Sequence, residues 1–264
     1  MEKRVLLLLL PVCVIAAGAD AQLLHYYKFE DASLVNETGS DGVNNGAVPS
    51  STVFAPDGVS RGSYYFDSGD SAATGLALLP AQQDFTLSLW MKSSMSGLGY
   101  LLSNEVPVNP PVSGRAALFV NEASLGSVFI SWDGGAGGPL ELDTGEIATG
   151  DWVHLALTRS AEGFDLYVNT VPVDSEVSLN GWSIADADWK IGSNHGGTYS
   201  LNGYIDELAV WDAAIPVGNG DSDPAGTSIK GVYYNGVPEP GTISFLALGG
   251  LAVAARRRRH RAGR

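Results

Sequence analysis

Short runs in which apolar and polar residues alternate dominate the chain between residues 22 and 236. In segment 85–93, FTLSLWMKS, every second residue from Phe85 to Met91 is apolar, and Lys92 falls on the opposite face. Successive side chains of a strand point to opposite sides, so this period of two predicts a strand with one apolar face. Further strands are predicted at 23–29, 63–67, 117–121, 127–132, 152–160, 164–169 and 203–211.

The sequence also predicts how two of these strands are connected and where a helix lies. Segments 152–160 and 164–169 are joined by Ala161-Glu162-Gly163, which predicts an antiparallel hairpin. Segment 228–236 instead follows a helical period, with Ile229, Val232 and Tyr233 at spacings of three and four. Many short strands bounded by Gly, Asn, Asp and Pro predict an all-β fold, a two-sheet antiparallel sandwich.

The charge distribution argues against nucleic acid as a partner. Between Gln22 and Pro240 stand 27 acidic residues against 7 basic ones, a net charge of −20, whereas six arginines and no acid follow Pro240. A nucleic-acid-binding domain carries its basic residues as a patch on the folded body. The C-terminal arginines therefore need another explanation.

The first 21 residues have the organisation of a secretory signal peptide. Lys3 and Arg4 precede the apolar segment 5–17, and Ala19-Asp20-Ala21 supplies a small-residue cleavage site. We therefore expect export of the protein and cleavage before Gln22. The single cysteine, Cys13, lies in the removed segment, so the mature protein would contain no disulfide.

The last part of the chain combines three features in order. Val237-Pro238-Glu239-Pro240 is followed by the apolar segment 241–255, which is followed by Arg256, Arg257, Arg258 and Arg259. As a helix the apolar segment spans roughly 22 Å. A bilayer core is about 30 Å thick, and snorkelling arginines make up part of the deficit. We predict a C-terminal transmembrane helix with the arginines as its cytoplasmic stop.

This order of motif, span and arginine cluster resembles the PEP-CTERM sorting signal of Gram-negative bacteria. The resemblance, centred on Pro238, Glu239 and Pro240, implies that an exosortase-type membrane protease removes the tail. It also implies a membrane-anchored stage, followed by release to the cell surface or the exopolysaccharide matrix. The expected divisions are a signal peptide (1–21), a body (22–236) and a sorting signal (237–264).

Six segments of the body follow one another in a characteristic order: HYYKFED, SYYFD, FTLSLWMK, the hairpin WVHLALTRSAEGFDLYVNTVPV, WKIGS and LNGYIDELAVWDAAI. In this order they resemble the LamG-like, concanavalin A-like jelly rolls of exported bacterial proteins. The resemblance covers about residues 24–236 and implies a jelly-roll sandwich. The chain departs from the family at Asn169-Thr170, where Asn-Gly is usual in the hairpin turn.

The fold implied by this resemblance also hosts glycoside hydrolases with the motif E-x-D-x-x-E. Here Tyr204 stands where the first acid is required. Asp206 and Glu207 are neighbours on a predicted strand and would point to opposite faces. A retaining hydrolase needs two carboxyl groups about 5–5.5 Å apart. We therefore expect a non-enzymatic protein, with a glycoside hydrolase as the outside alternative.

Acidic residues at the ends of the first and last long strands suggest a structural calcium ion. Glu30 and Asp31 end the first predicted strand, Asp206 and Glu207 lie in the last, and the terminal strands of a jelly roll often pair. Calcium takes six to eight oxygen ligands, so a site that includes Glu30 and Asp206 is predicted. In the alternative, Asp206 hydrogen-bonds the backbone in the core.

Two tryptophans near predicted loops are the candidates for ligand binding: Trp132, before a glycine-rich segment, and Trp182, in LNGWSIAD. Trp90, Trp152 and Trp211 fall inside strands and are expected to pack in the core or on a sheet face. The predicted function is carbohydrate binding at the cell surface, with surface polysaccharide as partner. The alternative is a structural or adhesive matrix protein with protein partners.

Overall fold

The computed structural model describes residues 21–29, 34–38, 43–45, 48–54, 61–67, 69–80, 83–104, 114–120, 129–132, 139–177, 184, 187–194, 196–197 and 199–237. The predicted signal peptide up to residue 20 and the sorting tail from Pro238 onward, with its arginines 256–259, lie outside the described residues. Within the described ranges, no helix combines the length and the apolar character needed to cross a membrane.

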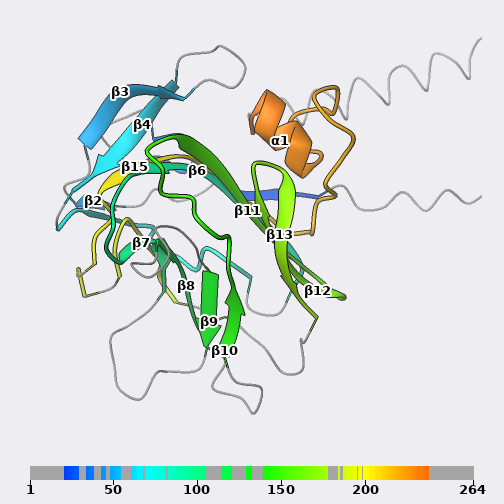
Figure 1. The fold of residues 1–264 in the computed structure, drawn as a ribbon, viewed down its shortest axis with the longest axis horizontal. Helices are drawn as coiled ribbons and strands as arrows, with labels where there is room; N and C mark the ends of the chain where they lie inside the picture. Colours follow the sequence, from blue (N-terminus) through cyan, green and yellow to red (C-terminus); the bar gives the residue numbers. More distant parts are fainter. Residues whose placement is uncertain are drawn as a thin grey trace, which may run out of the picture.

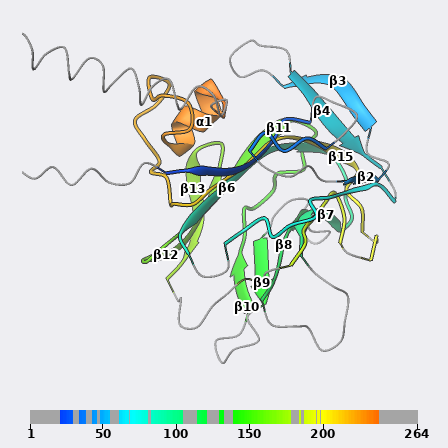
Figure 2. The same cartoon turned by 180° about the vertical axis from the view of Figure 1, so that it is seen from behind.

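Two antiparallel sheets face each other and form a β-sandwich (Figures 1 and 2). The strands of the first sheet are β1 (Leu23–Tyr27), β3 (Val48–Phe54), β4 (Arg61–Phe66), β6 (Phe85–Ser93), β11 (Trp152–Ser160), β12 (Gly163–Val168), β13 (Val171–Glu176) and β15 (Gly203–Trp211). Those of the second are β2 (Val43–Asn45), β5 (Ser71–Ala73), β7 (Gly99–Ser103), β8 (Arg115–Val120), β9 (Phe129–Trp132), β10 (Pro139–Leu142) and β14 (Lys190–Ile191).

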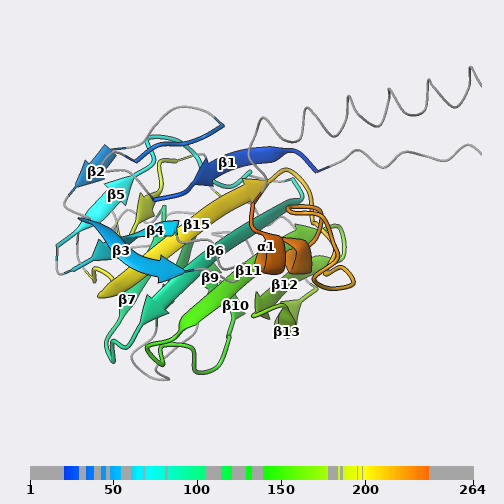
Figure 3. The same ribbon diagram turned by 90° about the horizontal axis from the view of Figure 1, so that it is seen from above.

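The order of the strands confirms the predicted two-sheet sandwich. The eight-stranded sheet runs β13-β12-β11-β6-β15-β4-β3, and β1 also pairs with β15. The seven-stranded sheet runs β10-β9-β8-β7-β14-β5-β2. The first and last strands pair antiparallel as predicted, with Tyr26 opposite Ala209 and Tyr27 opposite Leu208. Figure 3 shows β1 beside the second half of β15.

The hydrophobic core fills the space between the two sheets. The inward face of β6 carries the apolar residues that the alternation predicted, including Leu87, Leu89 and Met91, each at most 2% exposed. They pack in one cluster with Leu101 of β7 and Leu118 of β8 from the opposite sheet. The period of two along 85–93 therefore separates the face in this core from the opposite face, where Thr86, Ser88 and Trp90 are also buried.

The helix α1 (Ile229–Asn235) lies on the outer side of the eight-stranded sheet (Figures 1 and 3). Its N-cap is Ser228, whose hydroxyl accepts a hydrogen bond at 2.9 Å from the backbone N–H three residues on. Ile229 and Val232 are buried in a second cluster with Tyr26 and Ala156 of the sheet. The helix predicted at 228–236 and its apolar face are confirmed.

The predicted hairpin of β11 and β12 forms, and a two-residue turn connects β12 to β13. Val168 pairs with Val171 across this turn, and its two central residues, Asn169 and Thr170, have φ values of 48° and 70°. Both lie in the left-handed region that a type I′ hairpin turn requires. The departure from Asn-Gly therefore keeps the turn but places a β-branched residue in a strained conformation.

Candidate functional site

A β-bulge in β15 sets the positions of the two acids that the sequence singled out. Pairing with β6 is regular up to Asp206, which lies opposite Trp90, and resumes at Ala209. Glu207 and Leu208 therefore oppose a single residue of β6, and Glu207 has a φ of 51°. The bulge shifts the alternation of the strand by one residue.

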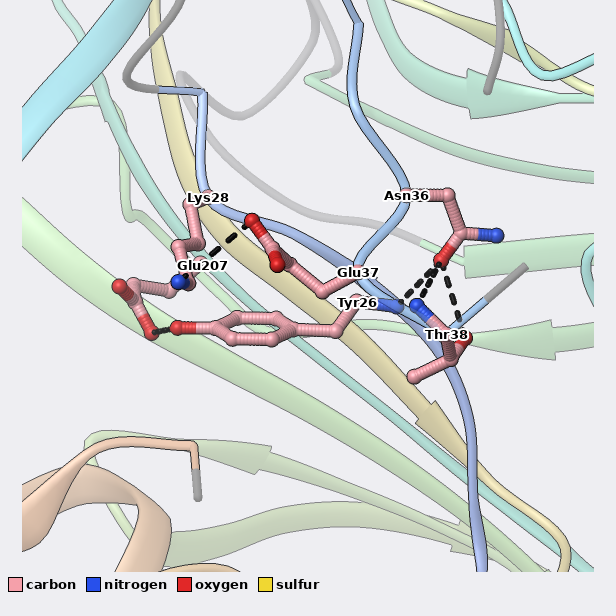
Figure 4. Close-up of polar contacts among 6 residues, drawn as sticks. All are labelled: Tyr26, Lys28, Asn36, Glu37, Thr38 and Glu207. Carbon is pink, nitrogen blue, oxygen red and sulfur yellow. Dashed lines mark hydrogen bonds and ion pairs between the residues drawn. The ribbon is translucent and has the colours of Figure 1, made fainter. Parts of the chain in front are cut away.

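Because of this shift, the prediction that the two acids point to opposite faces is wrong. Asp206 shares the outer face with Trp90, its cross-strand partner. Glu207 Oε2 accepts a hydrogen bond of 2.6 Å from the hydroxyl of Tyr26, which belongs to the cluster beneath α1 (Figure 4). Asp206 is fully buried, and its Oδ1 accepts a 2.8 Å hydrogen bond from the backbone N–H of Glu207. This hydrogen bond to the backbone is the alternative to calcium binding that the sequence suggested for Asp206.

The described residues do not by themselves supply a calcium shell. In this part of the chain, no group of three or more His, Cys, Asp or Glu side chains is placed to hold a metal ion. Glu30 and Asp31 lie outside the described residues. Calcium takes six to eight oxygen ligands, and Asp206 and Glu207 each already accept a hydrogen bond. Calcium therefore stays a prediction.

Polar residues near the end of β1 hold the chain that follows it. Asn36 Oδ1 accepts hydrogen bonds from the backbone N–H of Tyr26 at 3.1 Å and from the Thr38 N–H and hydroxyl at 3.2 and 3.0 Å (Figure 4). Lys28 and Glu37 form an ion pair of 3.5 Å. These contacts hold segment 34–38 against β1. They explain why polar residues occur here without a bound ligand.

A serine and a histidine meet beneath α1. Ser88 Oγ of β6 and His154 Nε2 of β11 are 2.8 Å apart, and both residues are buried. Burial lowers the pKa of His154 to about 3, so the ring is neutral at pH 7. The rings of Trp90 and Tyr233 lie 5.0 and 5.6 Å from the imidazole. With α1 in place these side chains are covered, so the pair contributes to packing and not to attack on a substrate.

Four residues from four strands form a row across the outer side of the eight-stranded sheet. Tyr65 of β4 pairs with Tyr204 of β15, and Tyr204 pairs with Lys92 of β6. Lys92 pairs in turn with Trp152 of β11. The Tyr204 ring lies 5.0 Å from the Tyr65 ring and 6.1 Å from the Trp152 ring. All four side chains are half-buried. We call these four residues the outer row.

The outer row borders α1 without being covered by it. The helix covers the neighbouring row of the sheet, where its Tyr233 lies 5.1 Å from Trp90 and 5.6 Å from His154. At the far end of the outer row, the hydroxyl of Tyr65 donates a 3.3 Å hydrogen bond to Oδ1 of the exposed Asn202. The row thus offers aromatic faces together with hydroxyl, amide and ammonium groups.

The tryptophans that the sequence favoured are not part of this row. Trp132 ends β9 and pairs with Arg115 of β8, in the other sheet. Trp182 lies outside the described residues. The outer row draws on segments 61–66, 85–93, 152–160 and 203–211. It can be recognised only when the pairing of these strands is known.

Known structures share this fold at low sequence identity. Domain 4 of AbnA, a GH43 extracellular arabinanase from Geobacillus stearothermophilus solved in complex with arabinotriose, matches with a TM-score of 0.56 and 19% identity over 75% of this chain and 96% of that domain. The receptor binding domain of botulinum neurotoxin C/D mosaic serotype gives 0.55 and 14% over 74% of this chain and 49% of that one. The binding domain of Paraclostridial Mosquitocidal Protein 1 gives 0.54 and 16% over 74% and 50%. This chain thus spans about half the length of the two toxin domains.

Comparison with sequence families gives one match in the body of the chain and one in its C-terminal tail. No curated protein matches the chain in sequence. Residues 236–259 match the PEP-CTERM protein-sorting motif, which confirms the resemblance of the tail. Residues 66–217, more than half of the chain, match a single family model and include β6, β11, β12 and β15. The chain therefore belongs to the concanavalin A-like lectin/glucanases superfamily.

Proposed function

We propose that this chain is an exported protein whose domain binds carbohydrate at the outer row. The observation that carries the proposal is the row of three aromatic rings on a sheet face that α1 leaves uncovered. The apolar C–H faces of sugar rings pack against aromatic rings, and their hydroxyls hydrogen-bond groups such as the Asn202 amide. Partly exposed aromatic clusters rimmed by polar groups mark interaction sites.

Two structural relatives support a binding role. The arabinanase domain was solved with arabinotriose, and the botulinum domain is a receptor binding domain. At sequence identities of 19% and 14%, these relatives support the fold. Which sugar this chain binds must be inferred from its own residues.

The sorting motif supports a proposal for where the protein works. Signal peptide 1–21 directs export, and a helix within 241–255 anchors the protein, with Arg256–Arg259 as its cytoplasmic stop. An exosortase-type protease then releases the body to the cell surface or exopolysaccharide matrix of a Gram-negative bacterium. Surface polysaccharide is the ligand present in that compartment.

The competing proposal is a structural or adhesive matrix protein, and the edge strand β13 favours it. Val171 and Val173 on this strand are 59% and 39% exposed, and Val177 just beyond it is 80% exposed. An exposed edge strand with apolar side chains can pair with another chain. This alternative predicts self-association that Val173→Lys prevents, without sugar binding.

Glycoside hydrolysis has less support than either binding role. Tyr204 occupies the outer row where the hydrolase motif requires its first acid. Asp206 and Glu207 are buried and engaged in hydrogen bonds. We therefore propose a non-enzymatic domain.

Glycan-array binding of the exported protein, purified from its host, tests the proposal. Tyr204→Ala and Trp152→Ala should each weaken binding at least tenfold on the scale of a lost anchor residue. Tyr199→Ala is the matched control, because this tyrosine is 57% exposed and lies beside Tyr100 of the other sheet. If both row variants bind glycan with wild-type affinity, the binding site does not lie at the outer row. Absence of binding to any glycan, with self-association in sedimentation, would favour the matrix alternative.

We also propose a structural calcium ion held by Glu30 and Asp206. The antiparallel pairing of β1 with β15 supports it, because Glu30 follows β1 in the sequence by three residues and Asp206 belongs to β15. A bound divalent cation would reduce the self-repulsion of a body with a net charge of −20. Calcium-dependent melting is its test.

A further inference from the structure

The outer row contains a lysine whose ammonium group is not neutralised by a neighbour. Lys92 occupies the register position between Tyr204 and Trp152, and its side chain is half-buried. Among the described residues, no ion pair, hydrogen bond or cation–π contact involves this lysine. The aliphatic stem of a lysine can pack on neighbouring rings while its ammonium group stays in water, so this charge is available to a negatively charged ligand.

Two other basic side chains of the body are engaged within the fold. Lys28 pairs with Glu37 at 3.5 Å. Arg159 donates to the Gln83 carbonyl at 3.1 Å and stacks 5.8 Å from the Phe164 ring. Lys92 differs from them because, among the described residues, neither an ion pair nor a hydrogen bond engages its ammonium group.

Acidic residues lie at both ends of the row. Burial raises the pKa of Tyr65, and the nearby carboxylates of Asp67 and Asp70 raise it further, so the Tyr65 end is acidic. Asp151, next to Trp152, is exposed. Lys92 lies away from both ends, at the register position between Tyr204 and Trp152, whose rings are 6.1 Å apart.

We infer that Lys92 makes the outer row selective for acidic polysaccharide, with the carboxylate of a uronic acid residue bound by the ammonium group. This inference rests on the proposed carbohydrate binding. A uronic acid ring can stack on Tyr204 or Trp152 while its carboxylate, which projects from the ring edge, reaches the lysine. The body has a net charge of −20 and repels polyanions at long range. Salt screens that repulsion beyond about 10 Å, so the local contact with Lys92 determines whether an acidic chain is preferred to a neutral one.

Calorimetry with paired ligands separates this inference from the function on which it rests. The probes are oligogalacturonate and oligomannuronate, each compared with its methyl ester, which has the same ring without the charge. The exported wild-type protein should bind at least one acid tenfold more tightly than its ester, and added salt should reduce that preference. Lys92→Met should abolish the preference, and Lys92→Arg should retain most of it.

Lys190→Met is the matched control, because this half-buried lysine lies on β14 of the other sheet. Equal affinity of the wild type for acids and esters would overturn the inference while leaving carbohydrate binding intact. A preference that persists in Lys92→Met, or that Lys190→Met lowers equally, would also overturn it. Binding to neutral glycans on the array, without binding to either acid, would likewise overturn the inference. Failure to bind every glycan would instead overturn the proposed function.

Discussion

His154 is fully buried beneath α1, and this burial makes the domain sensitive to mild acid. Burial lowers the pKa of His154 to about 3 in the folded protein, whereas an unfolded histidine titrates near 6.5. Between these values the unfolded state binds a proton that the folded state does not. The free energy of unfolding is therefore unaffected by His154 above about pH 6.5 and decreases as the pH falls from there towards about 3.

The size of the effect follows from the two pKa values. Within the window, each pH unit changes the free energy of unfolding by about 1.4 kcal/mol. At pH 7 the unfolded histidine is mostly neutral, and at pH 5 it is almost fully protonated. The loss between pH 7 and pH 5 is therefore about 2 kcal/mol, or roughly 4–8 °C in Tm for a domain of this size. Any folded pKa below about 4 gives nearly the same loss.

Urea denaturation at pH 7 and pH 5 measures this loss, with His154→Gln as the variant. Glutamine does not titrate and retains an amide that can bond the Ser88 hydroxyl. Both proteins should carry His25→Gln, because burial also lowers the pKa of His25. The variant should lose about 2 kcal/mol less than its parent between the two pH values, while the carboxylates common to both cancel. An identical loss in both proteins would show that His154 does not control the acid response.

Four further predictions address the turn, the bulge, the metal and the tail. Thr170→Gly should raise the free energy of unfolding by about 1 kcal/mol in urea melts, because its φ of 70° suits glycine. Tyr26→Phe should lower it by about 1–3 kcal/mol, because Glu207 loses a buried donor; a neutral effect would contradict that bond's role. Millimolar calcium should raise Tm beyond sodium chloride of equal ionic strength in the wild type but not in Asp206→Asn. Intact mass of the surface-released protein should lack residues 1–21 and the span after Pro240, and retention of Arg264 would contradict processing.

The long strands could be predicted because each has one face in the core. Segments 85–93, 152–160 and 203–211 became β6, β11 and β15 with the predicted bounds. The shorter strands β2, β5 and β14 have two or three residues, too few to display a period. The strand β13 has exposed valines at an edge, so its pattern does not distinguish it from a loop.

The arrangement of the site could not be predicted from single strands. In GYIDELAVW the core residues are Ile205, Leu208 and Val210, so one spacing is three instead of two. That spacing was the signal of the bulge, and reading the segment as a regular strand placed Glu207 on the wrong face. The outer row depends on the register of four strands. Register is set by turns, bulges and the whole core, which a local pattern does not contain.

Processing at both ends should leave the folded body intact, because both expected cuts fall outside the buried core. Leu23 and Val237 are the first and last buried residues of the described chain, and both belong to the cluster that packs α1 on the sheet. Cleavage before Gln22, or within the segment that follows Val237, removes neither residue. Val237 thus belongs structurally to the body, although the sequence assigned it to the sorting signal. Since this cluster holds α1 and α1 borders the outer row, carbohydrate binding should not require the tail.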